Sequence, residues 1–127
     1  MSEQLAIKAA QAVMTAHIDA LNRRDRAAIA ATLHFPHVRL SGTRLKTWDD
    51  QTSYLADFLA RAGASWHRSE FADIRVVRAS SDKVHLDVEV RRFDADDRLL
   101  TSFRSLWGLT EENGRWAAKM RSSFANA

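Results

Sequence analysis

The second half of the chain restricts the fold most, because four apolar-rich segments there are separated by three short polar turns. Short polar connections make neighbouring strands antiparallel, so these segments are expected to form one meandering sheet. The turns are residues 80–82, 94–97 and 111–114. The predicted strands are Ser65–Ala79, Lys83–Phe93, Arg98–Thr110 and Arg115–Phe124.

The beginning of the chain has a helical pattern. Apolar residues at helical spacing predict a first helix over Glu3–Asn22. Asp25 is expected to cap a shorter second helix that carries Ile29 and Leu33 on one face. Pro36 is expected to end this helix, because proline has no amide hydrogen and restricts the residue before it.

A small hairpin over residues 37–48 is expected next, followed by a third helix. Thr47 and Asp50 resemble a capping box at its start, and Gly63 is a natural stop. Its inward residues are expected to be Leu55, Phe58, Leu59 and Ala62. Helices followed by strands give an α+β fold, here a strongly bent antiparallel sheet around three N-terminal helices. We expect a single domain over residues 1–127.

The composition is that of a globular protein, with 46% hydrophobic and 28% charged residues. No apolar run is long enough to span a membrane, and the N-terminus lacks the pattern of a secretory signal. The chain has no cysteine, which excludes disulfides and fits a reducing compartment. These features predict a cytoplasmic protein that has no membrane partner.

The net charge of +3 and the isoelectric point near 9.8 raise the question of nucleic-acid binding. However, the arginines are scattered among acids, as in residues 23–26 and 89–94. This mixture favours a solvated surface with salt bridges, so no nucleic-acid partner is predicted.

The third predicted strand has apolar residues on both faces, which indicates either a doubly covered strand or an interface. Leu100 and Leu106, with Val76 or Val77 nearby, are interpreted as hints of a homodimer formed through the sheet. An additional core contact is the alternative interpretation.

The histidines are the first candidates for a site. His17 lies between Val13 and Leu21 on the apolar stripe of the first helix, so it should face the sheet. It is either a neutral imidazole in a pocket, usable as acid or base, or a buried ring bonded to a polar neighbour. His34 and His37 flank a turn where they could cap a helix or contact a polar ligand. No carboxylate stands at a supporting spacing, so no metal site is predicted.

The aromatic residues belong either to a core or to a pocket for a planar ligand. Phe103, Ser105 and Trp107 alternate onto one face of their strand and are the preferred pocket-lining residues. Arg121 would attract an anionic ligand if it points inward, but strand parity alone does not decide its direction. The predicted ligand-binding set is His17, His37, Tyr54, Phe58, Phe103, Ser105, Trp107 and Arg121, with His17 as the catalytic candidate.

The order of elements resembles the nuclear transport factor 2-like superfamily over nearly the whole chain. The resemblance is carried by HIDALNRRDRAAIAATL at residues 17–33, by FPHVRLSG and by EENGRWAAKMRSSF. Within this superfamily the chain is most similar to uncharacterised bacterial members. The resemblance implies a cystatin-like cone, in which the bent sheet encloses a pocket, and a homodimer through the outer sheet face.

The reactions known for this superfamily need residues that the chain only partly offers. A ketosteroid isomerase needs a tyrosine, a carboxylate base and an acidic donor, where alignment places His17, Ser41 and Ser105. This activity is therefore rejected. A dehydratase would need histidine, aspartate and orienting tyrosines, and the chain has one tyrosine. An epoxide hydrolase would need an Asp-Arg-Asp cluster, for which Asp73, Asp87 and Arg104 are available.

The sequence therefore predicts a small-molecule pocket protein of unassigned reaction, either a binding protein or a lyase, isomerase or hydrolase. No cofactor is predicted. The alternative is a non-catalytic homodimeric assembly module whose cone is filled by its own side chains. A cavity of about 300 Å³ or more would favour the pocket, and a packed interior would favour the module.

Overall fold

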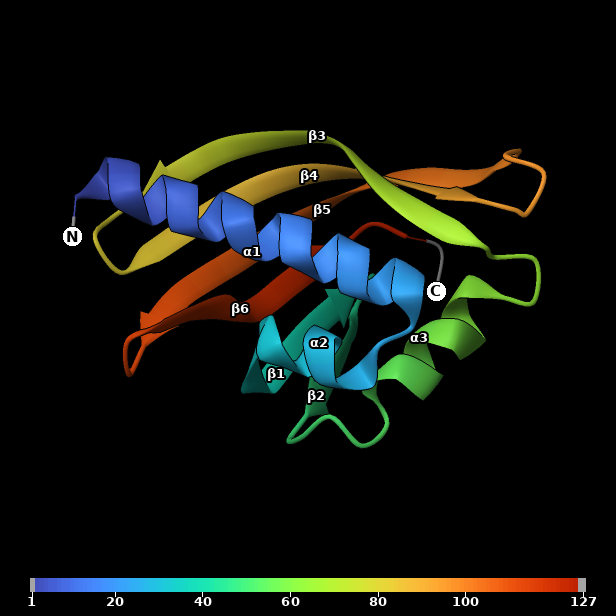
Figure 1. Ribbon diagram of the computed structural model, residues 1–127, viewed down its shortest axis with the longest axis horizontal. Helices are drawn as coiled ribbons and strands as arrows, with labels where there is room; N and C mark the ends of the chain where they lie inside the picture. Colours follow the sequence, from blue (N-terminus) through green and yellow to red (C-terminus); the bar gives the residue numbers. More distant parts are fainter. Residues whose placement is uncertain (1, 126–127) are drawn as a thin grey trace.

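The computed structural model describes residues 2–125, and in it a long helix crosses one face of a curled six-stranded sheet (Figure 1). The α+β prediction is confirmed. The helices are α1 (Glu3–Arg23), α2 (Arg26–Ala31) and α3 (Tyr54–Ala62). The strands are β1 (Leu33–Ser41), β2 (Arg44–Trp48), β3 (Arg68–Ala79), β4 (Lys83–Phe93), β5 (Leu99–Glu112) and β6 (Arg115–Ser123).

The strands lie in the order β2-β1-β6-β5-β4-β3, so the meander from β3 to β6 is as predicted. The sheet is not wholly antiparallel, because β1 pairs with β6 in parallel. The hairpin β1-β2 is thereby attached to the end of the meander, which lengthens the sheet and lets it curl around the helices. Figure 1 shows α1 lying along the meander, with α2 and α3 beside β1 and β2.

Local signals explain where α1 and α2 begin and end. The Ser2 side chain accepts a hydrogen bond from the Leu5 amide, and the Asp25 carboxylate accepts one from the Ala28 amide. Between the two helices Arg24 adopts the left-handed conformation with φ 55°.

The predicted role of Pro36 is wrong. The helix α2 already ends at Ala31, and Leu33 is paired with Ala118 of β6 instead of continuing the helical face. Pro36 lies within β1, after a cis peptide bond. Pairing with β6 thus sets the end of this helix, and the proline does not.

The predicted start of α3 is also wrong, whereas its end is confirmed. Thr47 lies in β2, and the Asp50 carboxylate accepts a hydrogen bond from the Thr52 amide instead of capping the helix. Gly63 ends α3 with φ 89°, which glycine adopts without strain. The prediction that Leu59 faces inward is wrong, because its side chain is exposed.

The core lies between α1 and the inner face of the sheet. Val84, Leu86 and Val88 alternate along β4 and are fully buried, as predicted. They pack with the small residues of α1, of which Ala6 and Ala10 are fully buried and allow close approach. Within residues 2–125, no helix is both long enough and apolar enough to cross a membrane.

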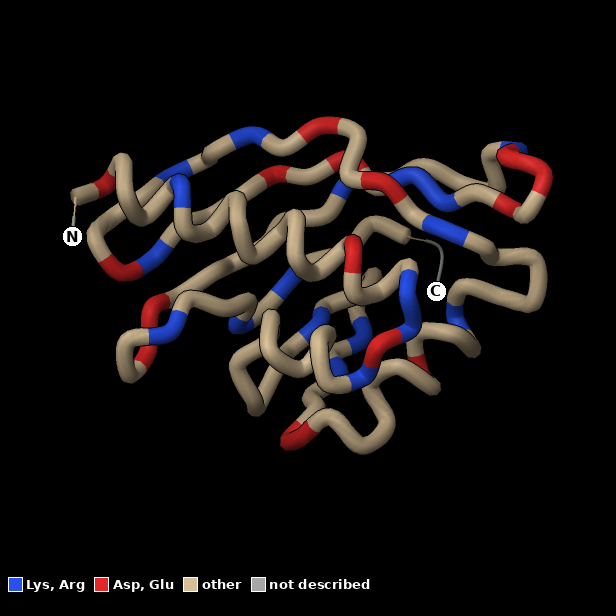
Figure 2. Tube along the Cα trace, in the orientation of Figure 1, with Lys and Arg blue, Asp and Glu red and all other residues tan. Residues whose placement is uncertain are grey.

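The outer sheet face carries an ionic cluster. The Arg104 guanidinium, on β5, lies 2.8 Å from Asp87 on β4 and 3.3 Å from Asp73 on β3. The Asp-Arg-Asp arrangement that the sequence allowed is therefore assembled, but none of the three residues lines the interior cavity described below. Figure 2 shows acidic and basic positions mixed along this part of the chain.

Candidate functional site

A small cavity lies inside the cone, bounded by α1, α3 and the inner face of the sheet. The centre of a water molecule has about 40 Å³ in which to move there, enough for a few water molecules. The cavity is thus far smaller than the 300 Å³ that would accommodate a drug-sized ligand. Its aromatic wall includes Phe58, Phe71, Phe103 and Trp107.

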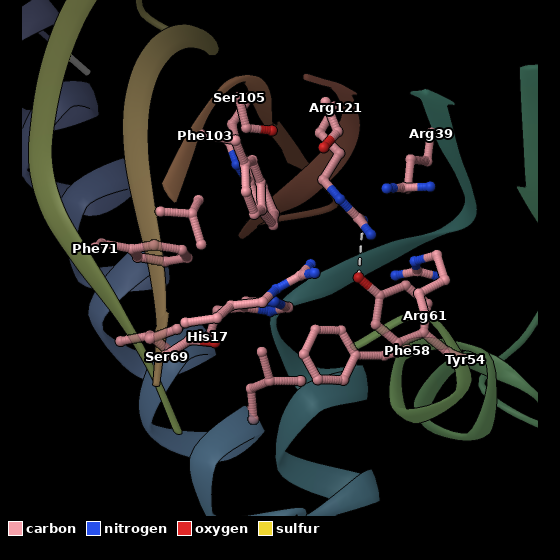
Figure 3. Close-up of a pocket in the computed structure, with 16 residues that line it drawn as sticks. His17, Arg39, Tyr54, Phe58, Arg61, Ser69, Phe71, Phe103, Ser105 and Arg121 are labelled. Atoms are coloured by element: carbon pink, nitrogen blue, oxygen red, sulfur yellow. Dashed lines mark hydrogen bonds between the residues drawn. The ribbon is translucent and has the colours of Figure 1, made fainter. Parts of the chain in front are cut away.

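Four arginines line this cavity, and we call them the arginine cluster: Arg39 of β1, Arg61 of α3, Arg92 of β4 and Arg121 of β6. No Asp or Glu lines the cavity. Three of the four are at most 8% exposed, and Arg61 is half-buried. Figure 3 shows the guanidinium ends of Arg39, Arg61 and Arg121 directed toward one region beside the Tyr54 hydroxyl.

Aromatic faces surround these cations where carboxylates would be expected. The Arg92 guanidinium lies 4.8 Å from the ring centroid of Phe103 and 5.4 Å from that of Phe58. The Arg121 guanidinium lies 5.2 Å from the Trp107 ring. Such contacts attract a cation without neutralising it. Among residues 2–125 no member of the arginine cluster has a salt bridge.

Burial without a neutralising carboxylate lowers the pKa of three arginines of the cluster. Burial, followed by repulsion from Arg121, lowers the pKa of Arg39 to about 10. The pKa values of Arg61 and Arg92 are also lowered to about 10, by burial and then by neighbouring arginines. These three arginines remain cations at neutral pH. The cavity therefore has a strongly positive field in a region of low dielectric, the condition in which a bound anion is most favoured.

Arg121 is held in place by two residues behind it. Its Nη1 donates to the Tyr54 hydroxyl and to His37 Nε2, both at 2.8 Å. The opposite ring nitrogen of His37, Nδ1, donates to the Ala118 carbonyl at 3.0 Å. His37 is therefore neutral in this arrangement, in agreement with a pKa lowered to about 2 by burial and then by Arg121.

His17 faces the cavity from α1. The Thr32 hydroxyl donates to the Ile29 carbonyl, so its oxygen accepts a hydrogen bond from His17 Nδ1 at 2.8 Å. Nε2 is then the unprotonated nitrogen of the neutral ring, and it has no hydrogen-bond partner within residues 2–125. Burial, with a smaller contribution from Arg121, lowers the pKa of His17 to about 3. His17 is thus both bonded to a neighbour and available as an acceptor in the cavity.

The structure brings together all but one of the predicted ligand-binding residues. The cavity is lined by His17, Tyr54, Phe58, Phe103, Ser105, Trp107 and Arg121. His37 is the exception, because it is fully buried behind Arg121 instead of standing at a pocket mouth. Ser41, which alignment placed at the position of a catalytic base, lies outside the cavity. Arg121, whose direction was open, points inward.

Sequence reasoning missed Arg39, Arg61 and Arg92. The prediction that Arg92 belongs to a salt-bridged surface is wrong, although its neighbour Arg91 does pair with Glu89 at 2.6 Å. A signal was available, because the inward alternation of β4 through Val90 reaches Arg92 next. Within residues 2–125, no three His, Cys, Asp or Glu side chains lie close enough to hold a metal ion.

Solved structures share this architecture. An NTF2-like protein of unknown function from Pseudomonas putida KT2440 superposes with a TM-score of 0.77 at 18% identity, covering 99% of this chain and 90% of that one. A protein of unknown function with a cystatin-like fold from Nostoc punctiforme PCC 73102 gives 0.78 at 12% identity, covering 96% and 92%. A candidate ketosteroid isomerase from Shewanella frigidimarina NCIMB 400 gives 0.69 at 13% identity, covering 91% and 94%.

No family model matches the chain, and no curated protein matches it. The likeness to solved structures is therefore a likeness of fold. The sheet order, the helix placement and the extent of the superpositions agree with the resemblance found in the sequence. This chain has the NTF2-like, cystatin-like fold.

Proposed function

We propose that this protein binds a small organic anion, with the anionic group held inside the cone by the arginine cluster. The observation that carries the proposal is that four guanidinium groups line one cavity that no carboxylate lines. A guanidinium binds a carboxylate, sulfonate or phosphate through paired hydrogen bonds. The cavity volume of about 40 Å³ suits such a head group and excludes a large ligand body.

The small volume of the cavity would also suit the alternative, an assembly module whose cone is filled by its own side chains. The buried charges of the arginine cluster argue against this alternative. A core that serves packing alone has no need of buried cations, and burying an unpaired charge costs several kcal/mol. In addition, the buried Nε atoms of Arg61 and Arg92 have no hydrogen-bond partner among the described residues. Buried N–H donors without a partner, on side chains whose charge is also unpaired, are better explained by a ligand that accepts their hydrogen bonds.

The groups beside the proposed anion define what chemistry is open to the site. Tyr54 accepts from Arg121, and its own proton has no acceptor within residues 2–125, so it can donate to the anion. His17 Nε2 is a neutral acceptor, and a pKa of about 3 makes it a poor base at neutral pH. The candidate ketosteroid isomerase shares only the fold, and its named activity does not transfer to a site without a carboxylate base.

Calorimetric titration with sodium sulfate and sodium benzoate, at constant ionic strength set with sodium chloride, tests the proposal. We expect saturable binding that Arg121→Gln reduces at least tenfold. The matched control is Arg78→Gln, which removes an exposed arginine of β3. If neither anion binds, or if both variants weaken binding equally, the arginine cluster is not an anion site.

We further propose that the protein is a cytoplasmic homodimer that associates through the outer face of the sheet. Leu106 pairs with Asp87 and Ser122 on that face, and Leu40 of β1, which pairs with the same Ser122, is 37% exposed there. Val76, which the sequence also offers for this patch, does not belong to it, because it pairs with the core residue Leu86. Leu106→Asp is expected to yield monomers in analytical ultracentrifugation, whereas Val76→Asp, on the opposite face of the sheet, is not.

A further inference from the structure

A second hollow lies on the other side of the arginine cluster, between α3 and the hairpin β1-β2, and we call it the hairpin groove. The centre of a water molecule has about 410 Å³ in which to move there, roughly ten times the interior space. Leu45 and Trp48 of β2 and Ala60 of α3 form its apolar surface. Leu45 is 68% exposed, so this apolar surface faces solvent.

The hairpin groove meets the interior cavity at two side chains. Arg39 and Arg61 line both spaces. Arg61 has no salt bridge within residues 2–125, and its Nε is buried without a hydrogen-bond partner. Its guanidinium lies 5.8 Å from the rings of both Phe58 and Trp48, one lining the interior and the other the groove. A ligand that engages Arg39 and Arg61 can therefore extend from one space into the other.

The charges of the groove suit an anion that approaches from this side. Arg44 and Lys46 line it in addition to Arg39 and Arg61. The one carboxylate in its wall, Asp57, accepts a hydrogen bond from Trp48 Nε1 at 2.8 Å and lies 3.8 Å from Lys46. Figure 2 shows basic positions gathered where β1 and β2 lie. The long stems of these lysine and arginine side chains add apolar surface below their charged ends.

We propose that the ligand is an amphipathic anion, with its head group on the arginine cluster and its apolar body in the hairpin groove. This inference rests on the proposed function, since it needs an anion inside the cone. The volumes of the two spaces support this division of the ligand, because the interior cavity has room only for a head group and the groove has room for an apolar body. A third hollow, beside Arg61 and Arg92, is a poorer place for the body, because Leu100 is its one large apolar side chain.

A series of straight-chain carboxylates from acetate to decanoate, used below their micelle concentrations in calorimetric titrations, tests this assignment. Each added methylene that enters the groove should tighten binding about two- to fourfold. Ala60→Trp fills the groove and should flatten this dependence, so that decanoate loses far more affinity than acetate. Ala56→Trp is the matched control, because Ala56 is exposed on the same helix and does not line the groove. Leu45→Ser removes apolar surface from the groove and should also reduce the dependence of affinity on chain length.

The outcomes separate the two proposals. Binding that needs Arg121 but is independent of chain length would overturn the groove assignment and leave the interior anion site standing. A chain-length dependence that survives both Ala60→Trp and Leu45→Ser would also overturn it, because the body would then lie elsewhere. Failure of every carboxylate in the series, together with sulfate and benzoate, would overturn both proposals.

Discussion

Arg39 and Arg121 are paired residues on the parallel strands β1 and β6. Paired positions point to the same face of a sheet, and here that face is the interior of the cone, so the pairing places two like charges side by side. His37 lies two residues before Arg39 on the same face and accepts a hydrogen bond from Arg121. The parallel junction of the hairpin with the meander therefore builds half of the arginine cluster.

The first prediction concerns the stability cost of this cluster. Arg92→Met keeps the length of the side chain against Phe58 and Phe103 but removes a buried cation. In buffer without multivalent or organic anions, the free energy of unfolding should rise by about 1–2 kcal/mol, because an unpaired buried charge is relieved. Urea denaturation measures this change. Arg78→Met, on the exposed part of β3, should stay within about 0.5 kcal/mol of the wild type. Destabilisation by Arg92→Met would mean that the cation is compensated in the folded protein.

The second prediction concerns the hydrogen bond from Arg121 to Tyr54. Tyr54→Phe removes the acceptor and leaves a buried N–H of Arg121 without its partner. The loss should be about 1–3 kcal/mol of unfolding free energy, the usual penalty for an orphaned buried donor. In an Arg121→Met background the same substitution should cost much less, because the donor is absent. A double-mutant cycle by urea denaturation measures the coupling, and additive effects would contradict the proposed role of this bond.

The fold followed from the sequence because its signals are local and repeated. The alternation of Val84, Leu86 and Val88 fixed the inward face of β4, and the polar turns fixed the order of the meander. The parallel pairing of β1 with β6 did not follow, because it joins residues about eighty positions apart that no local pattern connects. The same long-range pairing places Leu33 in β1, although the local spacing of apolar residues predicts a helix there.

The site was only partly predictable for a related reason. Phe103, Ser105 and Trp107 follow from alternation within one strand, so their inward direction could be read from the sequence. Arginine is usually a surface residue, and this expectation concealed Arg92, which lies at the next inward position after Val90. The convergence of four arginines from four different elements is a property of the fold that no single segment contains.

The third prediction concerns the attachment of α1 to the edge strand β3. The Asn22 side chain donates to the Ser69 carbonyl at 2.9 Å and accepts from the Ser69 amide at 2.8 Å. It thus satisfies both backbone groups of Ser69, which a neighbouring strand would otherwise pair with. Asn22→Ala should lower the unfolding free energy by about 1–3 kcal/mol. Asn22→Asp should also destabilise, because a carboxylate cannot donate to the Ser69 carbonyl. Asp19→Ala, one turn earlier on the exposed side, should change stability by less than about 0.5 kcal/mol. Urea denaturation of all three variants measures these differences, and an unchanged Asn22→Ala would contradict the role of this contact.

The fourth prediction concerns how the free energy of unfolding depends on pH through His17. Burial lowers the pKa of His17 from 6.5 to about 3 in the folded protein. Between these two values the unfolded chain binds a proton at His17 that the folded chain does not, so the free energy of unfolding falls as the pH falls. Above pH 6.5 both forms are neutral and the contribution is constant. The slope attributable to one such histidine approaches about 1.4 kcal/mol per pH unit near the middle of this window.

Urea denaturation between pH 7.5 and 5 measures that slope in the wild type and in His17→Gln, which keeps a donor for Thr32 but cannot titrate. His17→Gln should have a shallower slope below pH 6.5, and His67→Gln, at an exposed position, should match the wild type. His37 keeps its own contribution in all three proteins, because its pKa is lowered by burial and by Arg121. Saturating benzoate places a negative charge beside Arg121, which weakens the repulsion felt by His17 and should reduce the wild-type slope. An identical slope in His17→Gln and in the wild type would mean that His17 takes up its proton at the same pH in the folded cone as in the unfolded chain, which contradicts its burial as a neutral ring.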